Sequence, residues 1–208
     1  MCMLMDLTVH DFMGTVAADS PAPGGGSVAA CTGACGAALM AMVCRLTLRG
    51  REEGDTAVGR MLALAEEKRR EMEVLVEEDA AAFHRVMDAL RLPKGTPAEK
   101  EKRRQALLEA TLYAARVPLR TAFLCVELLE HIQVLVDRGN QNALSDAAVA
   151  LECLYAACRG ACYNVRINLK GLEPSARKEV ILQQMEEMER RAVGYYLAGR
   201  ELLGQKGL

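Results

Sequence analysis

The sequence predicts an all-α protein folded as one helical bundle domain over residues 1–208. Its residues are dominated by the strong helix formers Ala, Leu, Met, Glu and Arg. No segment alternates between apolar and polar residues for long enough to predict a strand. Apolar residues make up 51% and charged residues 26% of the chain, and no linker divides it, so one core with a solvated surface is expected.

The first two helices are separated by a run of glycines. A short helix is predicted from about Thr8 to Ala18, with Thr8 and Asp11 placed as a capping box. Pro21 and Pro23 end it, because proline cannot continue a helix. A second helix begins within the glycines and runs to about Leu48. Small residues recur along it every four positions, which lets another helix approach closely: Ala29, Gly33, Ala37 and Ala41.

The remaining helices are delimited by caps, glycines and prolines. A long helix is predicted over residues 55–90, and Thr96, Pro97 and Glu99 form the next start signal. Two helices, or one helix kinked at Pro118, then reach residue 138, where a glycine stops them. Two further helices are expected over about 147–170 and 174–203.

Composition excludes several classes of function. The net charge of −2 comes from intermixed acidic and basic residues without a basic stripe, so we expect no nucleic-acid partner. The 25 positions from Ser20 to Cys44 carry no charge, but turn-forming and small residues dominate them. This favours a buried helix of a soluble bundle over a membrane span. With eight cysteines at helical spacings and no secretory leader, we expect reduced thiols in the cytoplasm.

Asp79 is the most informative polar residue. It lies four residues after Leu75 and four before Phe83, on the apolar face of the third helix. Burial would raise the pKa of this carboxyl and suit it to proton transfer near neutral pH. The alternative is a structural aspartate that an arginine or a helix N-terminus satisfies, and the pattern alone does not decide between them.

Three other features could bind a ligand. The "PGGGS" segment opens a helix, and its exposed amides could hold a carboxylate or a carbonyl-rich heterocycle, or the glycines could serve a close helix crossing. Asn140, Asn142 and Ser145 lie at the start of the 147–170 helix, where free N–H groups and the helix dipole favour an anion. Helix capping would also explain Ser145. Along that helix, polar ends flank a floor of small residues that could take a flat ligand or a neighbouring helix: Asp146, Ala150, Cys153, Ala157, Gly160, Asn164 and Asn168.

No metal site is expected. Cys31 with Cys35, and Cys158 with Cys162, are each one helical turn apart, but no CxxC pair or nearby histidine completes a tetrahedral set. Small core residues explain these thiols better.

Together these segments resemble the cyclodeaminase/cyclohydrolase family, which includes the C-terminal domain of formiminotransferase-cyclodeaminase and bacterial methenyltetrahydrofolate cyclohydrolases. The matching blocks occur in the expected order over nearly the whole chain: "DSPAPGGGSVAA" (19–30), "EDAAAF" (78–83), "RLPKGTP" (91–97), "VPL" (117–119), "GNQNALSDAAVA" (139–150) and "NVRINL" (164–169).

The resemblance implies a helical homodimer that binds folate at or near the subunit interface, without metal or redox cofactor. It implies formiminotetrahydrofolate cyclodeaminase activity, with methenyltetrahydrofolate cyclohydrolase as the alternative; a non-catalytic folate-binding or scaffold dimer is the alternative of another class. Asp79 matches the catalytic aspartate of the family. The implied substrate-binding residues are Pro23, Gly24, Gly25, Gly26, Ser27, Lys94, Asn140, Ser145, Asp146, Asn164 and Asn168.

Overall fold

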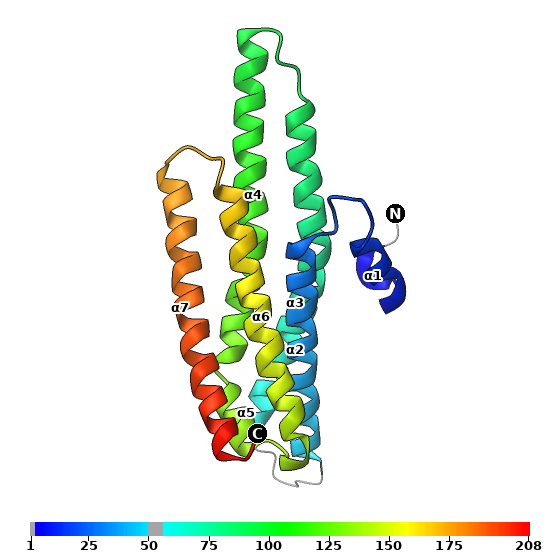
Figure 1. Ribbon diagram of the computed structural model, residues 1–208, viewed down its shortest axis with the longest axis vertical. Helices are drawn as coiled ribbons and strands as arrows, with labels where there is room; N and C mark the ends of the chain where they lie inside the picture. Colours follow the sequence, from blue (N-terminus) through cyan, green and yellow to red (C-terminus); the bar gives the residue numbers. More distant parts are fainter. Residues whose placement is uncertain (1–2, 50–55) are drawn as a thin grey trace.

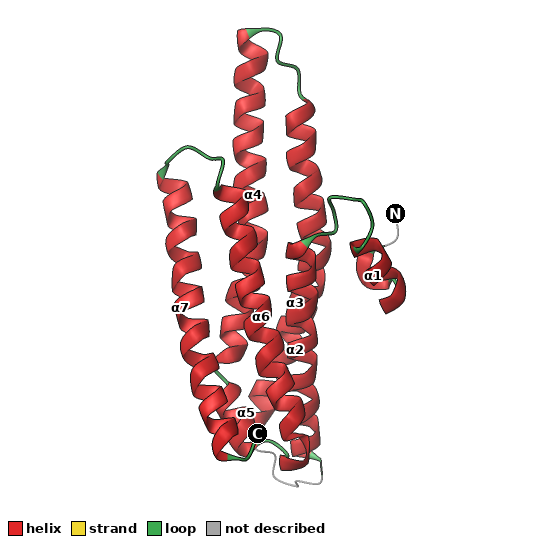
Figure 2. Cartoon of the chain, in the orientation of Figure 1, coloured by secondary structure: helices red, strands yellow, loops and turns green. Residues whose placement is uncertain are grey.

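The computed structural model describes residues 3–49 and 56–208, and within these ranges it is all-helical, as predicted (Figure 2). A short 3-10 turn, η1, which the sequence did not suggest, covers Leu4–Asp6. The helices are α1 (Val9–Val16), α2 (Gly25–Leu48), α3 (Thr56–Arg91), α4 (Pro97–Leu129), α5 (Ile132–Arg138), α6 (Leu144–Leu169) and α7 (Ala176–Gln205), with the 3-10 turn η2 (Gln141–Ala143) before α6.

The helices run roughly along one axis of an elongated bundle, from which α1 stands apart at the side (Figure 1). α2 packs between α3 and α6, and α4 contacts α3, α6 and α7. The end of α3 and the start of α4 extend beyond the other helices as a hairpin (Figure 1). The core is therefore shared by helices that are distant in sequence.

Most helix boundaries agree with the predictions, because local chemistry determines them. Thr96 caps α4 through a reciprocal capping box with Glu99. Thr8 caps α1 by accepting from the N–H of Asp11. The predicted start of the third helix, at residue 55, lies outside the described residues. Near Pro118 the chain stays one helix until Leu129, and a separate helix, α5, then reaches Arg138.

The small-residue stripe of α2 packs inside this chain. A Cβ on Gly33 would lie 2.6 Å from the Sδ atom of Met72 in α3 and 3.4 Å from the Cβ of Ala157 in α6. Gly33 is therefore a point where α2 approaches both neighbouring helices closely. By length and composition α2 could cross a membrane, yet 61% of its most apolar window is buried within the bundle, as expected of a core helix.

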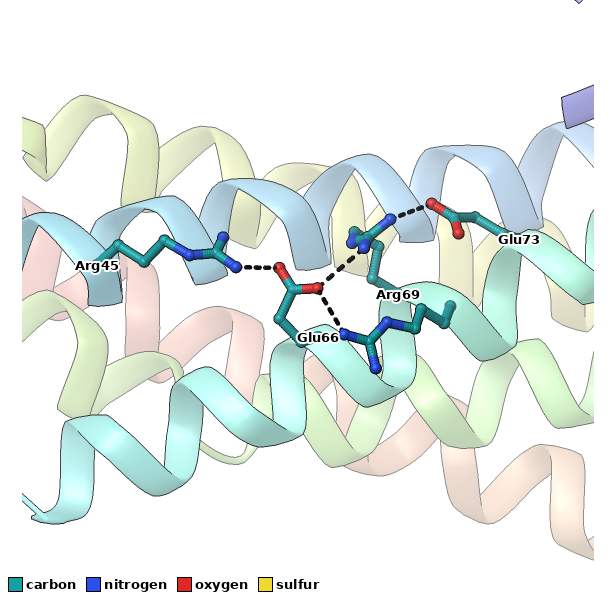
Figure 3. A network of polar contacts seen from close by, with 5 residues as sticks. Arg45, Glu66, Arg69 and Glu73 are labelled. Atoms are coloured by element: carbon teal, nitrogen blue, oxygen red, sulfur yellow. Dashed lines mark hydrogen bonds and ion pairs between the residues drawn. The ribbon is translucent and has the colours of Figure 1, made fainter. Parts of the chain in front are cut away.

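An ion-pair network ties α2 to α3 on the bundle surface (Figure 3). Glu66 of α3 accepts from Arg45 of α2 at 2.8 Å and from Arg69 at 2.9 Å. Arg69 also pairs with Glu73. The bond from Arg69 and then that from Arg45 lower the pKa of Glu66, against the effect of its partial burial.

We expect Glu66→Gln to lower the thermal unfolding midpoint at pH 7. A carboxyl whose pKa is lowered by folding contributes stability above its unfolded pKa, and that contribution is lost as pH falls through the folded pKa. The difference in midpoint between wild type and variant should therefore shrink below about pH 4. Differential scanning calorimetry across the acid and neutral range measures it, and a pH-independent difference would contradict the assignment.

Candidate functional site

The site is a pocket of about 340 Å³ at the end of the bundle where α2 begins. Its volume is in the range of small-molecule sites. The loop before α2 provides one wall, α3 and α4 provide two more, and the end of α6 closes it. The lining residues are Pro21, Ala22, Gly24, Asp79, Phe83, Val86, Thr111, Ala114, Ile167, Asn168 and Gly171.

Asp79 is the only one of these lining residues with a titratable side chain. Its carboxylate lies against the first turn of α2, within 3.1 Å of the hydroxyl of Ser27. Burial raises the pKa of Asp79, while the hydroxyl and the backbone N–H of Ser27 oppose that rise. The N-terminus of a long helix adds a favourable field for the ionised form. Burial and the contacts with the helix start therefore act in opposite directions on the pKa of Asp79, and burial is the larger effect.

Gly26 makes this arrangement possible. A Cβ at this position would lie 2.0 Å from one carboxylate oxygen of Asp79 and 2.6 Å from the other. Only a residue without a side chain lets the carboxylate lie over the helix start. The close-approach interpretation therefore applies to Gly26, and the group that approaches is the carboxyl of the chain's own Asp79; binding of a ligand by the glycine amides stays a prediction.

The structure brings several other predicted site residues to the same end of α6. Pro23 is buried and follows a cis peptide bond, and Gly24 is the N-cap of α2 and lines the pocket. A Cβ on Gly25 would lie 3.2 Å from the side-chain amide of Asn164. That amide donates to the carbonyl of Gly160 at 2.8 Å. Asn164 therefore lies beside the helix start, where it is bonded to its own helix.

Asn168 resolves a defect that Pro118 creates. Proline has no N–H, so the carbonyl of Ala114, four residues earlier in α4, lacks its helical partner. The side-chain amide of Asn168 donates to that carbonyl at 2.7 Å. Asn168 therefore joins α6 to α4 directly at the pocket wall, and this bond helps α4 to continue through the proline.

The middle of the predicted α6 face receives a helix. Ala150 and Ala157 are buried, and a Cβ on Gly160 would touch Ala29 of α2 at 3.4 Å. Of the two possibilities for this face, helix packing is correct for its centre. Only its last polar residue, Asn168, lines the pocket.

Four predicted binding residues lie elsewhere in this chain. Asn140 precedes η2, and Ser145 and Asp146 are in the first turn of α6. The rise of about 1.5 Å per residue puts Ser145 about 35 Å from Asn168. Asn140 is bonded there, since its N–H donates to Thr47 and its side chain accepts from Asn142. Lys94 is exposed in the loop between α3 and α4, outside the pocket lining. A single chain therefore does not bring these four residues to the pocket of Asp79, and their role in binding stays a prediction.

Sequence reasoning missed two kinds of pocket residue. Thr111 and Ala114 of α4 line the pocket, but a small residue in a helix gives no signal of this. Near the pocket, Glu78 accepts from the hydroxyl of Tyr113 at 2.6 Å, and Arg85 stacks 4.5 Å above that ring. These contacts join α3 to α4 beside Asp79.

A larger groove of about 530 Å³ runs between α1 and α2, but its walls carry apolar side chains, one threonine and the thiols of Cys31 and Cys35. It holds no carboxylate or imidazole that could transfer a proton near neutral pH. Among the residues the structure describes, no three His, Cys, Asp or Glu side chains form a group that could hold a metal ion. The chemistry therefore points to the smaller pocket at Asp79.

Comparison with known proteins gives concordant matches. A family model described as formiminotransferase-cyclodeaminase matches residues 8–187. The chain is 38% identical to a methenyltetrahydrofolate cyclohydrolase of Methylorubrum extorquens, over 86% of this chain and 87% of that protein. It is 39% identical to the formimidoyltransferase-cyclodeaminase of Mus musculus, over 85% of this chain but 33% of that protein.

Solved structures include a match to a formiminotetrahydrofolate cyclodeaminase of Thermotoga maritima. The TM-score is 0.86 at 27% identity, and the alignment covers 99% of this chain and 100% of the other. The helical arrangement is therefore shared over the full described bundle.

Proposed function

The chain belongs to the formiminotransferase-cyclodeaminase family, and we propose that it acts on the carbon bridging N5 and N10 of tetrahydrofolate, with Asp79 as general acid and base. The observation that most supports this proposal is the half-buried carboxylate of Asp79, which lines the pocket and is bonded by Ser27 in the first turn of α2. A structural aspartate could also bond the start of α2, and the place of Asp79 at the wall of a pocket favours the catalytic role.

Two reactions of this bridge fit the site. In the hydrolytic reaction, Asp79 accepts a proton from water as the oxygen attacks the methenyl carbon. The tetrahedral adduct then collapses: the bond from carbon to N5 breaks, N5 takes the proton from Asp79, and the hydroxyl loses its own proton to give 10-formyltetrahydrofolate. The relative named methenyltetrahydrofolate cyclohydrolase supports this assignment.

In the cyclodeaminase reaction, N10 attacks the carbon of the formimino group of 5-formiminotetrahydrofolate, whose nitrogen already carries two protons as an amidinium, and N10 gives its proton to Asp79. Asp79 returns the proton to the departing nitrogen, which leaves as ammonia, and the methenyl bridge remains. The Thermotoga maritima structure and the Mus musculus relative support this assignment. Both reactions consist of proton transfers around one tetrahedral carbon, so we propose that they need no metal or redox cofactor. We also propose a cytoplasmic location for the protein.

The proposal is tested with purified protein and each substrate in turn. Loss of the 5,10-methenyltetrahydrofolate chromophore, corrected for spontaneous hydrolysis, assigns the cyclohydrolase reaction. Ammonia release from 5-formiminotetrahydrofolate with gain of that chromophore assigns the cyclodeaminase reaction. No turnover of either substrate by folded protein would contradict the proposal and favour a folate-binding or scaffold role.

We also propose that the chain is a homodimer, paired through an exposed stripe on α6. α6 lies between α7 and α2 in the bundle (Figure 1). Along the side of α6 that is not fully buried, residues recur at alternating intervals of four and three, as in the seam of paired helices. All of them are exposed or partly exposed: Val149, Cys153, Ala156, Gly160, Tyr163 and Ile167. Gly160 lies at the edge of this stripe, where a Cβ would also meet Ala29 of α2. Val149, Tyr163 and Ile167 are 50%, 53% and 61% exposed.

An antiparallel pairing of two copies about the centre of this stripe would be self-complementary. The small residues Ala156 and Gly160 would meet across a twofold axis, and Ile167 would face Val149 of the partner subunit. The start of one α6 would then lie near the end of the other. Ser145 and Asp146 of the partner subunit would thus approach the pocket of Asp79, which accounts for predicted site residues that one chain keeps apart.

Subunit complementation tests this arrangement. We expect Asp79→Asn and Asp146→Asn homodimers to be impaired, because each changes both sites. After mixing in equal amounts under exchange conditions, half of the dimers are heterodimers with one unaltered site, so activity should recover to about a quarter of wild type. Light scattering verifies the dimer. A monomer, or mixed dimers without recovery, would contradict the shared site.

A further inference from the structure

Ser27 is a polar side chain that contacts both Asp79 and the backbone beneath it. Its side chain is fully buried in the first turn of α2. The hydroxyl oxygen lies 3.0 Å from the carbonyl oxygen of Val76 and 3.1 Å from a carboxylate oxygen of Asp79. Val76 precedes Asp79 by three residues in α3, so both neighbours belong to the same helical turn.

A serine hydroxyl has one hydrogen to donate and lone pairs with which to accept. When Asp79 is ionised, both neighbours are acceptors, and the hydrogen goes to the carboxylate, because charge-assisted bonds are stronger. When Asp79 is protonated, its own O–H can donate to the hydroxyl oxygen of Ser27. The hydroxyl hydrogen of Ser27 is then free to turn to the carbonyl of Val76. Each charge state of Asp79 therefore leaves the hydroxyl of Ser27 bonded.

We propose that Ser27 is a positioning residue whose hydroxyl turns between the carboxylate of Asp79 and the carbonyl of Val76 each time Asp79 releases or takes up its proton. The inference rests on the proposed function, in which Asp79 accepts and returns one proton per turnover. A group that can only donate, such as the backbone N–H of Ser27, favours the ionised form of Asp79, and a group that can only accept would favour the protonated form. The hydroxyl of Ser27 can do both, so it offers a bond to either form.

The surroundings leave Ser27 as the main polar partner of Asp79. α2 carries no charged residue before Arg45. From α6, the amides of Asn164 and Asn168 face this end of the bundle, and both donate to backbone carbonyls. The adjacent acid of α3, Glu78, is bonded to Tyr113 of α4, whose ring lies under Arg85. The pocket lining from the loop before α2 adds no titratable group.

The test measures the titration of Asp79 directly, without substrate. Carbon-13 NMR of protein labelled at aspartate carboxyls follows each resonance with pH, and Asp79→Asn identifies the signal of Asp79. In Ser27→Ala the ionised form loses a charge-assisted bond, so the pKa of Asp79 should rise by about one unit. The acid limb of kcat/KM against pH should move to higher pH by the same amount, since the ionised form is the base.

Two variants separate this role from packing. Ser27→Thr keeps a hydroxyl and should keep the titration of Asp79 close to that of wild type. Thr32→Ala removes another hydroxyl of α2, one that donates to the carbonyl of Val28, and it should move neither the resonance nor the acid limb. Circular dichroism verifies that each variant folds.

An unchanged titration of Asp79 in folded Ser27→Ala would overturn the inference, because the hydroxyl would then serve only to bond the backbone of α3. The proposed function fails in a different way. If wild-type protein turned over neither folate while the resonance of Asp79 still moved in Ser27→Ala, the bond from Ser27 to Asp79 would stand and the reaction assignment would fall.

Discussion

Asp79→Asn is expected to lower kcat by about 10²- to 10⁴-fold, the usual contribution of a positioned general acid and base. The asparagine amide can donate to the hydroxyl of Ser27 as the protonated acid does, and its oxygen can accept from the backbone N–H of Ser27. The variant therefore imitates one charge state of Asp79 and cannot reach the other. Turnover of both folates, with folate affinity measured by titration calorimetry, separates lost chemistry from lost binding.

The same variant should be at least as stable as wild type at pH 7. Burial raises the pKa of Asp79, and for a group with a raised folded pKa the stabilising contribution is present at low pH and lost as pH rises through that pKa. An asparagine at this position would not carry the cost of burying a charge. Urea unfolding at neutral and at acid pH should show the advantage of the variant shrinking as pH falls. An inactive but destabilised variant would instead indicate a structural aspartate.

The sequence predicts the helices well because helix ends are local events. Thr96 with Glu99, and the glycines before α2, act within a few residues of themselves, and the observed boundaries follow them. Asp79 is visible for the same reason, since a carboxylate on an apolar helical face breaks a period of 3.6 residues.

The partners of Asp79 are not visible, because they depend on tertiary packing. Ser27 and Asp79 are 52 residues apart, and nothing in either segment encodes their meeting. Pro118 likewise leaves the carbonyl of Ala114 without a helical partner, and Asn168, far along the chain, bonds that carbonyl. The sequence alone therefore could not decide between one helix and two at this proline. The separation of Ser145 and Asn168, by contrast, follows from the length of one helix, so the sequence already indicates that a single chain keeps these two residues apart.

Gly26→Ala is expected to lower kcat by about 10²-fold, because displacement of a reacting group by about 1 Å is enough for such a loss. The new Cβ would lie 2.0 Å from a carboxylate oxygen of Asp79, so either the carboxylate or the start of α2 must move. Overpacking costs about 1–3 kcal/mol, partly offset by the better helix propensity of Ala, worth about 1 kcal/mol. A 10²-fold fall in kcat corresponds to about 2.7 kcal/mol, so the loss of activity should exceed the net loss of stability of about 0–2 kcal/mol.

A double-mutant cycle on the free energy of unfolding tests whether the loss of stability comes from the clash with the carboxylate of Asp79. In an Asp79→Ala background the clash has no partner, so adding Gly26→Ala should leave the free energy of unfolding unchanged or raise it by up to about 1 kcal/mol. Gly194→Ala in α7 is the matched control, because a Cβ there meets nothing within 4 Å, and it should leave kcat unchanged. Equal destabilisation by Gly26→Ala in both backgrounds would show that the glycine serves the helix start alone. Coupling between the two positions would show that Gly26 is a glycine because Asp79 occupies the space of its side chain.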